Sequence, residues 1–367
     1  MKLLFIPSRW AVAIKPIVLF LGSLLFTNSV VANPHAHHAH EHTGDSPIGT
    51  MGDHNHEVGE WMLSYRFMRM SMEGSLQGDD SISADAIATT IPNIFFGMPM
   101  MPATLRVVPL DMKEEMHMLG AMYGLSEDVT LMFMLNYIDK TMDHLTYMGG
   151  MPTTMTRGVF TTTTRGMGDS KASAIIKLRD SDSHKLYLNA GISIPTGSID
   201  EQDRVLTPMG TEPEMRLPYP MQLGSGTWDL EPGLTYTGVD GKLSWGAQGR
   251  AVIRIGENSE DYTLGDQLHL SGWGAFRLVD NISASIRVSY SDIGDIDGQD
   301  PEIMAPVQTA NPDNAGGERI DAAYGLSFRL EGGQRIAVEY IDVIEQEVNG
   351  VQLEMTDMLV VGIQAPL

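Results

Sequence analysis

Residues 112–137 read MKEEMHMLGAMYGLSEDVTLMFMLNY, and this stretch decides the fold. Large apolar or aromatic side chains occupy alternate positions in residues 119–123 and again in residues 129–137. A period of two predicts β-strands with two different faces. The short polar stretch 125–128 between the runs predicts a hairpin turn. The second face carries several methionines, so it resembles neither a solvent face nor a uniform core face.

The same alternation recurs along the rest of the chain. Short turns regularly separate the strands of a pair, and longer segments, such as 73–110, 141–162, 196–226 and 294–318, separate the pairs. This arrangement is typical of a bacterial outer-membrane barrel. The prediction is therefore an all-β fold: a single antiparallel transmembrane β-barrel of about 12 strands in residues 59–367, with short periplasmic turns and long outer loops. The alternative is a soluble, secreted β-sandwich or lipocalin-like barrel, whose apolar face would point inward.

The N-terminus predicts export. Lys2, Arg9 and Lys15 precede an apolar run at 16–26, and small residues follow at 30–32, so residues 1–32 are expected to be a cleaved signal peptide. A membrane anchor is the alternative, although the run is short for a spanning helix. Residues 33–58 are polar and His-rich, and we expect a flexible tail that offers nothing to pack. The expected location is the outer membrane, with both termini periplasmic.

Composition narrows the partners. The chain has no cysteine, so a closed hydrogen-bonded barrel must supply stability without disulfides. Its formal net charge of −23 argues against nucleic acid as a partner. The expected partners are outer-membrane lipid and a small-molecule or metal-ion solute. The sequence contains no nucleophile elbow, phosphate-binding glycine loop or zinc-protease motif, so we expect no enzymatic activity and no required cofactor.

Three short segments carry a family resemblance. They are Gly166-Met167-Gly168-Asp169, Pro195-Thr196-Gly197 and the segment LPYPMQLGSG at 217–226. In these segments the chain resembles the outer-membrane family labelled as transporters of the phenol meta-degradation pathway, over most of its length from about residue 60. The resemblance implies a barrel channel distantly similar to fatty-acid and aromatic-hydrocarbon porins.

Charged residues on the predicted inner faces form the first candidate site. A polar lining suits a solute-conducting barrel, whereas an internal salt-bridge network that closes a narrow barrel is an equally good interpretation. The predicted solute path comprises Arg66, Lys177, Arg250, Arg254, Arg287, Arg329, Glu231 and Glu339.

Histidine and methionine form the second candidate site. Imidazoles bind Cu, Zn or Ni, and thioethers favour Cu(I). The chain has 26 methionines, most of them before residue 170, and many fall on inner faces of the first strands. They could equally fill a narrow lumen or give an apolar solute a smooth path. The predicted metal ligands are His35, His37, His38, His40, His42, His54, His56, Met116, Met118, Met132 and Met134.

Two functions therefore remain open from the sequence. The first is an outer-membrane channel or transporter for a small solute, with an apolar or aromatic compound as one candidate. The second is a copper-binding or other metal-binding outer-membrane protein that serves metal acquisition or resistance.

Overall fold

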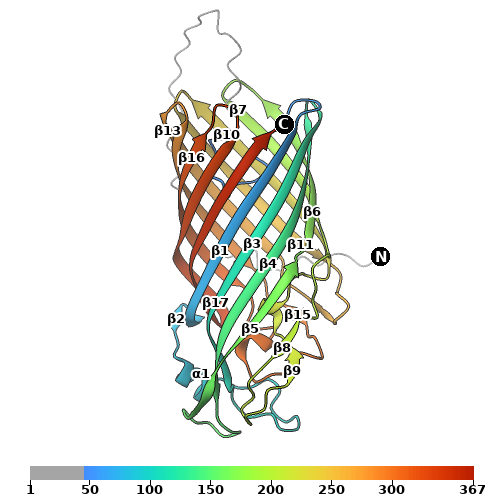
Figure 1. The fold of residues 1–367 in the computed structure, drawn as a ribbon, viewed down its shortest axis with the longest axis vertical. Helices are drawn as coiled ribbons and strands as arrows, with labels where there is room; N and C mark the ends of the chain where they lie inside the picture. Colours follow the sequence, from blue (N-terminus) through green and yellow to red (C-terminus); the bar gives the residue numbers. More distant parts are fainter. Residues whose placement is uncertain (1–44) are drawn as a thin grey trace, which may run out of the picture. The chain divides into compact units, whose positions relative to one another are not determined.

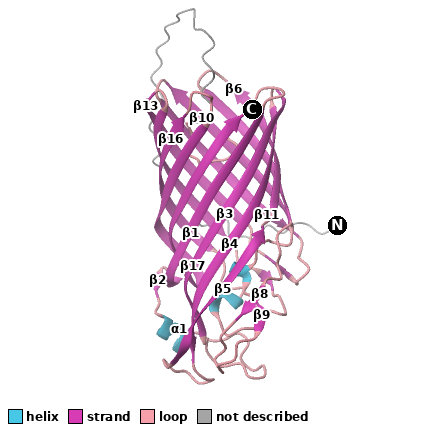
Figure 2. Ribbon diagram, in the orientation of Figure 1, coloured by secondary structure: helices cyan, strands magenta, loops and turns pink. Residues whose placement is uncertain are grey.

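The computed structural model describes residues 45–367, which consist almost entirely of β-structure (Figures 1 and 2). The elements are β1 (Trp61–Gly78), β2 (Asp80–Ser81), α1 (Ala84–Thr90), β3 (Val107–Ser126), β4 (Val129–Tyr147), β5 (Thr156–Met167), β6 (Ser170–Asp180), β7 (His184–Ile194), β8 (Gln202–Arg204), β9 (Glu214–Arg216), η3 (Tyr219–Met221), β10 (Trp228–Asp240), β11 (Leu243–Ile255), β12 (Tyr262–Thr263), β13 (Gln267–Val279), β14 (Ile282–Ile293), β15 (Asp297–Gly298), η4 (Gln308–Ala310), β16 (Gly317–Arg329) and β17 (Arg335–Pro366).

The long strands close into one antiparallel barrel. The main sheet has 13 strands, and eleven of them form a ring that is closed by pairing of β17 with β1. The other two, β2 and β5, lie outside the ring, where β2 pairs with β1 and β5 pairs with β4. β17 supplies two passes, because Arg335 lies opposite Arg329 and Pro366 opposite Met62, both at the short-turn end. The strand reverses near Gly350, whose φ is 63°. Twelve passes result, which confirms the predicted barrel.

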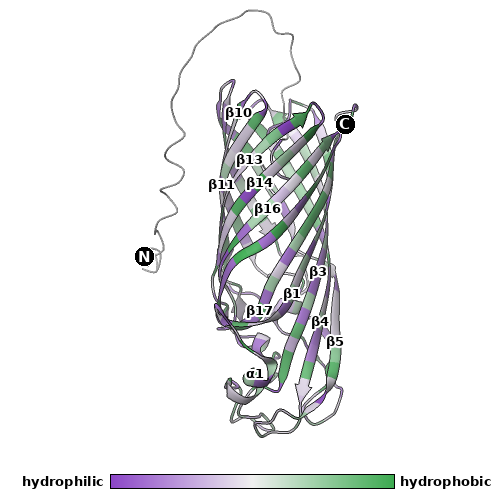
Figure 3. Cartoon of the chain, turned by 90° about the vertical axis from the view of Figure 1, so that its left-hand side faces the viewer, coloured by the Kyte–Doolittle hydropathy of each residue, from purple (hydrophilic) through white to green (hydrophobic). Residues whose placement is uncertain are grey.

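Alternation separates an apolar outer surface from a mixed lumen. Trp61, Leu63, Leu119, Leu131 and Phe133 are all more than 40% exposed, whereas their neighbours Met62, Met122 and Met134 are at most 6% exposed. The alternative, a soluble sandwich or lipocalin-like barrel with its apolar face inward, is therefore wrong for the described residues. Figure 3 shows the resulting alternation of hydropathy along individual strands.

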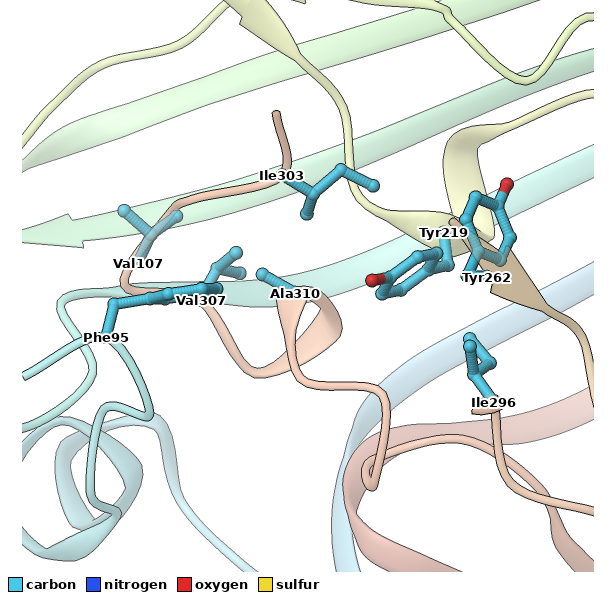
Figure 4. Packing of buried hydrophobic residues seen from close by; sticks show 8 residues of the cluster. All are labelled: Phe95, Val107, Tyr219, Tyr262, Ile296, Ile303, Val307 and Ala310. Carbon is cyan, nitrogen blue, oxygen red and sulfur yellow. The ribbon is translucent and has the colours of Figure 1, made fainter. Parts of the chain in front are cut away.

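The loops at the other end form a second packed layer. β1, β3 and β4 continue past the ring, and α1, β5, β8 and β9 gather beside these extensions (Figure 1). Figure 4 shows the apolar cluster that joins the loops, with the Tyr219 and Tyr262 rings edge to face at 4.9 Å between centroids. Ser83 caps α1 by accepting a hydrogen bond from the Ala86 backbone N–H at 3.2 Å.

The segment 141–162, expected to be a loop, is largely strand. β4 continues to Tyr147, and β5 begins at Thr156 and pairs with it. This segment is rich in threonine, a β-branched residue that packs well on a pleated surface. None of the helices in residues 45–367 has the length and apolar character needed to cross a bilayer.

Candidate functional site

Residues 45–58, here called the lumen segment, lie inside the barrel. Ile48 is 2% exposed and packs against Ala337 and Ile341 on the inner face of β17. Gln248 on β11 donates a hydrogen bond to the Met51 carbonyl oxygen at 2.7 Å. The His56 backbone N–H donates to Thr130 Oγ1 on β4 at 2.9 Å. Contacts on opposite sides of the ring show that the segment crosses the lumen.

The lumen segment lies near the short-turn end. Asp45 forms ion pairs with Arg277 and Arg329, which are close to the turns after β13 and β16. At the other end of the segment, the Gly59 backbone N–H donates a hydrogen bond to the Gly124 carbonyl oxygen, and the Gly124 N–H donates to the Glu60 carbonyl oxygen, near the β3–β4 turn. The prediction that residues 33–58 offer nothing to pack is wrong for residues 45–58. The segment is polar because its partners in the lumen are polar. His35, His37, His38, His40 and His42 lie outside the described residues.

Ion pairs line the side of the lumen formed by β6, β10 and β11. Glu231 on β10 interacts with Lys171 at 2.5 Å and with Arg250 at 3.4 Å. Arg254 pairs with the buried Asp229 at 2.5 Å. The predicted lining residues thus mostly neutralise one another, as in the salt-bridge interpretation.

The remaining predicted lining residues have different environments. Arg287 pairs with Glu339 at 2.9 Å. Lys177 lies at the short-turn rim, where Asp180 is 3.2 Å and Asp128 is 3.7 Å away. Arg66 on β1 borders a small cavity that is lined by methionines, and its Nε is buried without a hydrogen-bond partner.

Methionines line the side of the lumen formed by β1, β3 and β4. Met62, Met122 and Met132 are direct cross-strand partners and form a row across these three strands. Gly120 and Met134 form part of the next row. Of the predicted methionines, Met118, Met132 and Met134 border one small cavity together with His54. Met116 lies in the row after that of Met118, directly opposite Met68 on β1.

The sequence-based prediction does not include two features of this site. Met62 and Met122 were left out of the ligand set although their inner-face positions follow from the alternation. Asp45 and Asp53 were assigned to a flexible tail, and only the folded lumen segment shows their role. In residues 45–367, no three His, Asp or Glu side chains come together as a metal-binding group.

The long-loop end is covered by the segment that follows β9. Met221 is fully buried and packs with Met112 and Met142 of the long strands. Lys140 on β4 donates hydrogen bonds to the carbonyl oxygens of Pro220 and Gln222, both at 2.8 Å. The lumen is therefore covered at both ends by parts of the same chain.

Asp169 joins the three segments that carry the family resemblance. Its carboxylate accepts hydrogen bonds from the Gly197 backbone N–H at 3.0 Å, and from the backbone N–H and hydroxyl of Ser225, both at 2.8 Å. A Cβ on Gly197 would lie 2.7 Å from the Gly224 Cα, so only glycine allows this approach. These segments therefore fix the long loop to the barrel rim.

The fold was compared with those of known proteins. No protein-family model and no curated protein matches the sequence. A crystal structure of an outer-membrane channel from Pseudomonas putida F1 is similar, with a TM-score of 0.56, 13% identity, and coverage of 87% of this chain and 99% of that chain. A FadL homologue from Pseudomonas aeruginosa aligns with a TM-score of 0.38, 10% identity, and coverage of 84% and 89%. The Pseudomonas putida toluene transporter TodX aligns with a TM-score of 0.40, 8% identity, and coverage of 83% and 89%.

Proposed function

We propose that this chain is an outer-membrane channel for a small solute, with the short turns in the periplasm and the long loops outside the cell. The observation that carries the proposal is the closed ring of strands with an apolar outer surface around a lumen that holds charges and thioethers. A closed barrel satisfies every strand edge, which a bilayer requires. The fold shared with an outer-membrane channel supports the same assignment.

The outer surface suits lipid contact. The exposed aromatic residues Trp61 and Trp228 are the first residues of β1 and β10, and interfacial girdles occur at such strand ends. A hollow of about 490 Å³ on the outer wall is bordered by Trp61, Phe133 and Ile192, and it offers space for part of an acyl chain. Lipid is therefore the partner proposed for this surface.

The lumen suggests the class of solute. Thioethers on one side are apolar and polarizable, while the opposite side carries paired charges. Such a two-sided lumen suits a small apolar or aromatic compound with a polar group. Passage requires movement of the lumen segment at one end and of the loop around Met221 at the other. The proposed channel is therefore gated.

Single cysteines test location and orientation, because the natural chain has none. Met100 is 87% exposed at the long-loop end, and Glu127 is exposed in the short β3–β4 turn. Met100→Cys should react with an impermeant maleimide on intact cells, and Glu127→Cys should react only after the outer membrane is opened. Equal labelling of both in intact cells would contradict the orientation. Recovery of the protein in the soluble periplasmic fraction would contradict the membrane location.

Flux tests the channel itself. Proteoliposomes that contain the purified chain should take up a small aromatic acid such as benzoate faster than protein-free liposomes. Measurement at a pH where the acid is fully ionised keeps its passage through the lipid slow. Equal rates in the two preparations would contradict a channel for this class of solute.

A further inference from the structure

We propose that the lumen contains a binding site for a soft monovalent metal ion, Cu(I), formed by the thioethers of Met62, Met122 and Met132 and the imidazole of His54. The site does not depend on the solute-channel proposal, because it requires only the folded barrel and the lumen segment. Soft thioether sulfur favours Cu(I) over harder divalent ions, and imidazole is a compatible fourth ligand.

The register of the strands brings the three sulfur atoms to one place. Met62 on β1 lies opposite Met122 on β3, and Met122 lies opposite Met132 on β4. Directly opposed residues on one face of an antiparallel sheet have Cβ atoms roughly 5 Å apart. The flexible side chains of these methionines can therefore converge on one ion. Packing already places Met62 and Met122 in one cluster with Met132 against it.

A cavity lies where the ion would bind. The three methionines, Met134 and His54 border a space of about 20 Å³, which suits a single small occupant. The space exists partly because Gly120, in the next row, has no side chain. A Cβ there would come within 2.4 Å of Ser64 Oγ.

The His54 ring is held as a ligand would be. Its Nδ1 lies 2.8 Å from Asp53 Oδ1, and both residues are more than 90% buried. With the proton on Nδ1 donated to the carboxylate, Nε2 is left with a free lone pair. A histidine that binds metal commonly uses its other nitrogen in this way, which fixes the tautomer. The negative charge of Asp53 also offsets Arg66, which borders the same cavity.

A second imidazole repeats the arrangement. His56 Nδ1 lies 3.2 Å from Glu60 Oε2, and His56 Nε2 is buried without a hydrogen-bond partner. The centroids of the His54 and His56 rings are 5.0 Å apart. A buried, unpartnered nitrogen is costly unless something occupies it. The two rings are nearly perpendicular, and each directs Nδ1 at a carboxylate, so both leave Nε2 available for a metal ion.

X-ray absorption on the full-length protein distinguishes this site from nitrogen ligands elsewhere in the chain. The purified protein is loaded anaerobically with one equivalent of Cu(I), and sulfur scattering around copper is measured. The wild type should show a sulfur shell, which the triple variant Met62→Leu, Met122→Leu, Met132→Leu should lose. Met→Leu conserves volume closely enough for the barrel to fold. The control variant Met100→Leu, Met151→Leu, Met155→Leu changes exposed loop methionines and should keep the shell.

Two outcomes would overturn the site: a wild-type spectrum with only nitrogen or oxygen scatterers, or an unchanged sulfur shell in the triple variant. Heat-modifiable migration on gels reports whether each variant is folded. If the triple variant does not fold, each single Met→Leu change should remove about one sulfur scatterer, and no change in any of them would contradict the proposal. Asp53→Asn should weaken Cu(I) binding by roughly 10- to 100-fold, as expected for loss of an outer-shell partner. Unchanged affinity would contradict the role of His54.

Discussion

Arg287 on β14 and Glu339 on β17 form an ion pair of 2.9 Å across the intervening strand β16, and Glu339 is completely buried. The pair spans β16 at Ala323 and Gly325, whose small or absent side chains leave room. The second carboxylate oxygen of Glu339 accepts a hydrogen bond from the Gly49 backbone N–H at 2.9 Å. One buried carboxylate therefore connects the barrel wall with the lumen segment.

Glu339→Gln should destabilise the barrel and loosen the lumen segment. The change leaves the Arg287 charge buried without its partner, and breaking a buried pair typically costs about 3–5 kcal/mol. Urea unfolding followed by tryptophan fluorescence measures the loss. Glu345→Gln, an exposed change on the same strand, is the matched control and should cost less than about 0.5 kcal/mol. Equal stability of the two variants would contradict the connection.

Asp169→Ala should free the long loop and leave the barrel intact. The carboxylate accepts three hydrogen bonds from Gly197 and Ser225, and a hydrogen bond to a charged group contributes about 1.5–3 kcal/mol. Protease cleavage within residues 195–227 should become at least tenfold faster, because local opening becomes easier. Asp182→Ala, in an exposed turn, is the control. Cleavage at wild-type rates in Asp169→Ala would show that the loop is held by other contacts.

Packing of the long loops should weaken at high pH. Burial, together with the nearby Asp300 carboxylate, raises the pKa of Tyr219 to about 12 from its usual 10. The folded protein therefore retains this proton at a pH where the unfolded chain releases it, and stability falls as the pH rises from about 10 towards 12. The ultraviolet phenolate titration of the wild type minus that of Tyr219→Phe should show one ionisation near pH 12. An ionisation near pH 10 would contradict the buried position.

The barrel follows from the sequence because its pattern is local. Alternation assigns Leu119 and Phe133 to the outer face and Met118 and Met132 to the lumen, and a shift of one residue would invert both assignments. The paired charges on the inner faces could also be identified, although their partners could not.

The lumen segment could not be found in this way. Ile48 is an isolated apolar residue in a polar stretch, and its neighbours Ala337 and Met358 are 289 and 310 residues away in the sequence. Asp45 and Asp53 look like solvent-exposed carboxylates until the barrel places Arg277 beside Asp45 and buries Asp53 together with its sequence neighbour His54. The convergence of His54 with the methionines likewise depends on tertiary structure. The sequence therefore indicates the residue types of the candidate site but not their assembly.

The central claim is that this barrel is a channel closed by its own lumen segment, and planar-bilayer conductance of the purified full-length chain tests it directly. A side chain at Gly52 would begin 2.0 Å from Asn189 Oδ1, so Gly52→Leu should displace the segment. Gly59→Leu is the control, because Gly59 also has a positive φ but nothing within 4 Å. The three proteins are compared in the Asp169→Ala background, which frees the long loop at the other end of the lumen. We predict small or rare conductance steps for this background alone and with Gly59→Leu, and larger, longer openings with Gly52→Leu. Identical conductance in all three proteins would contradict closure by the lumen segment, and no conductance in any of them would contradict the channel.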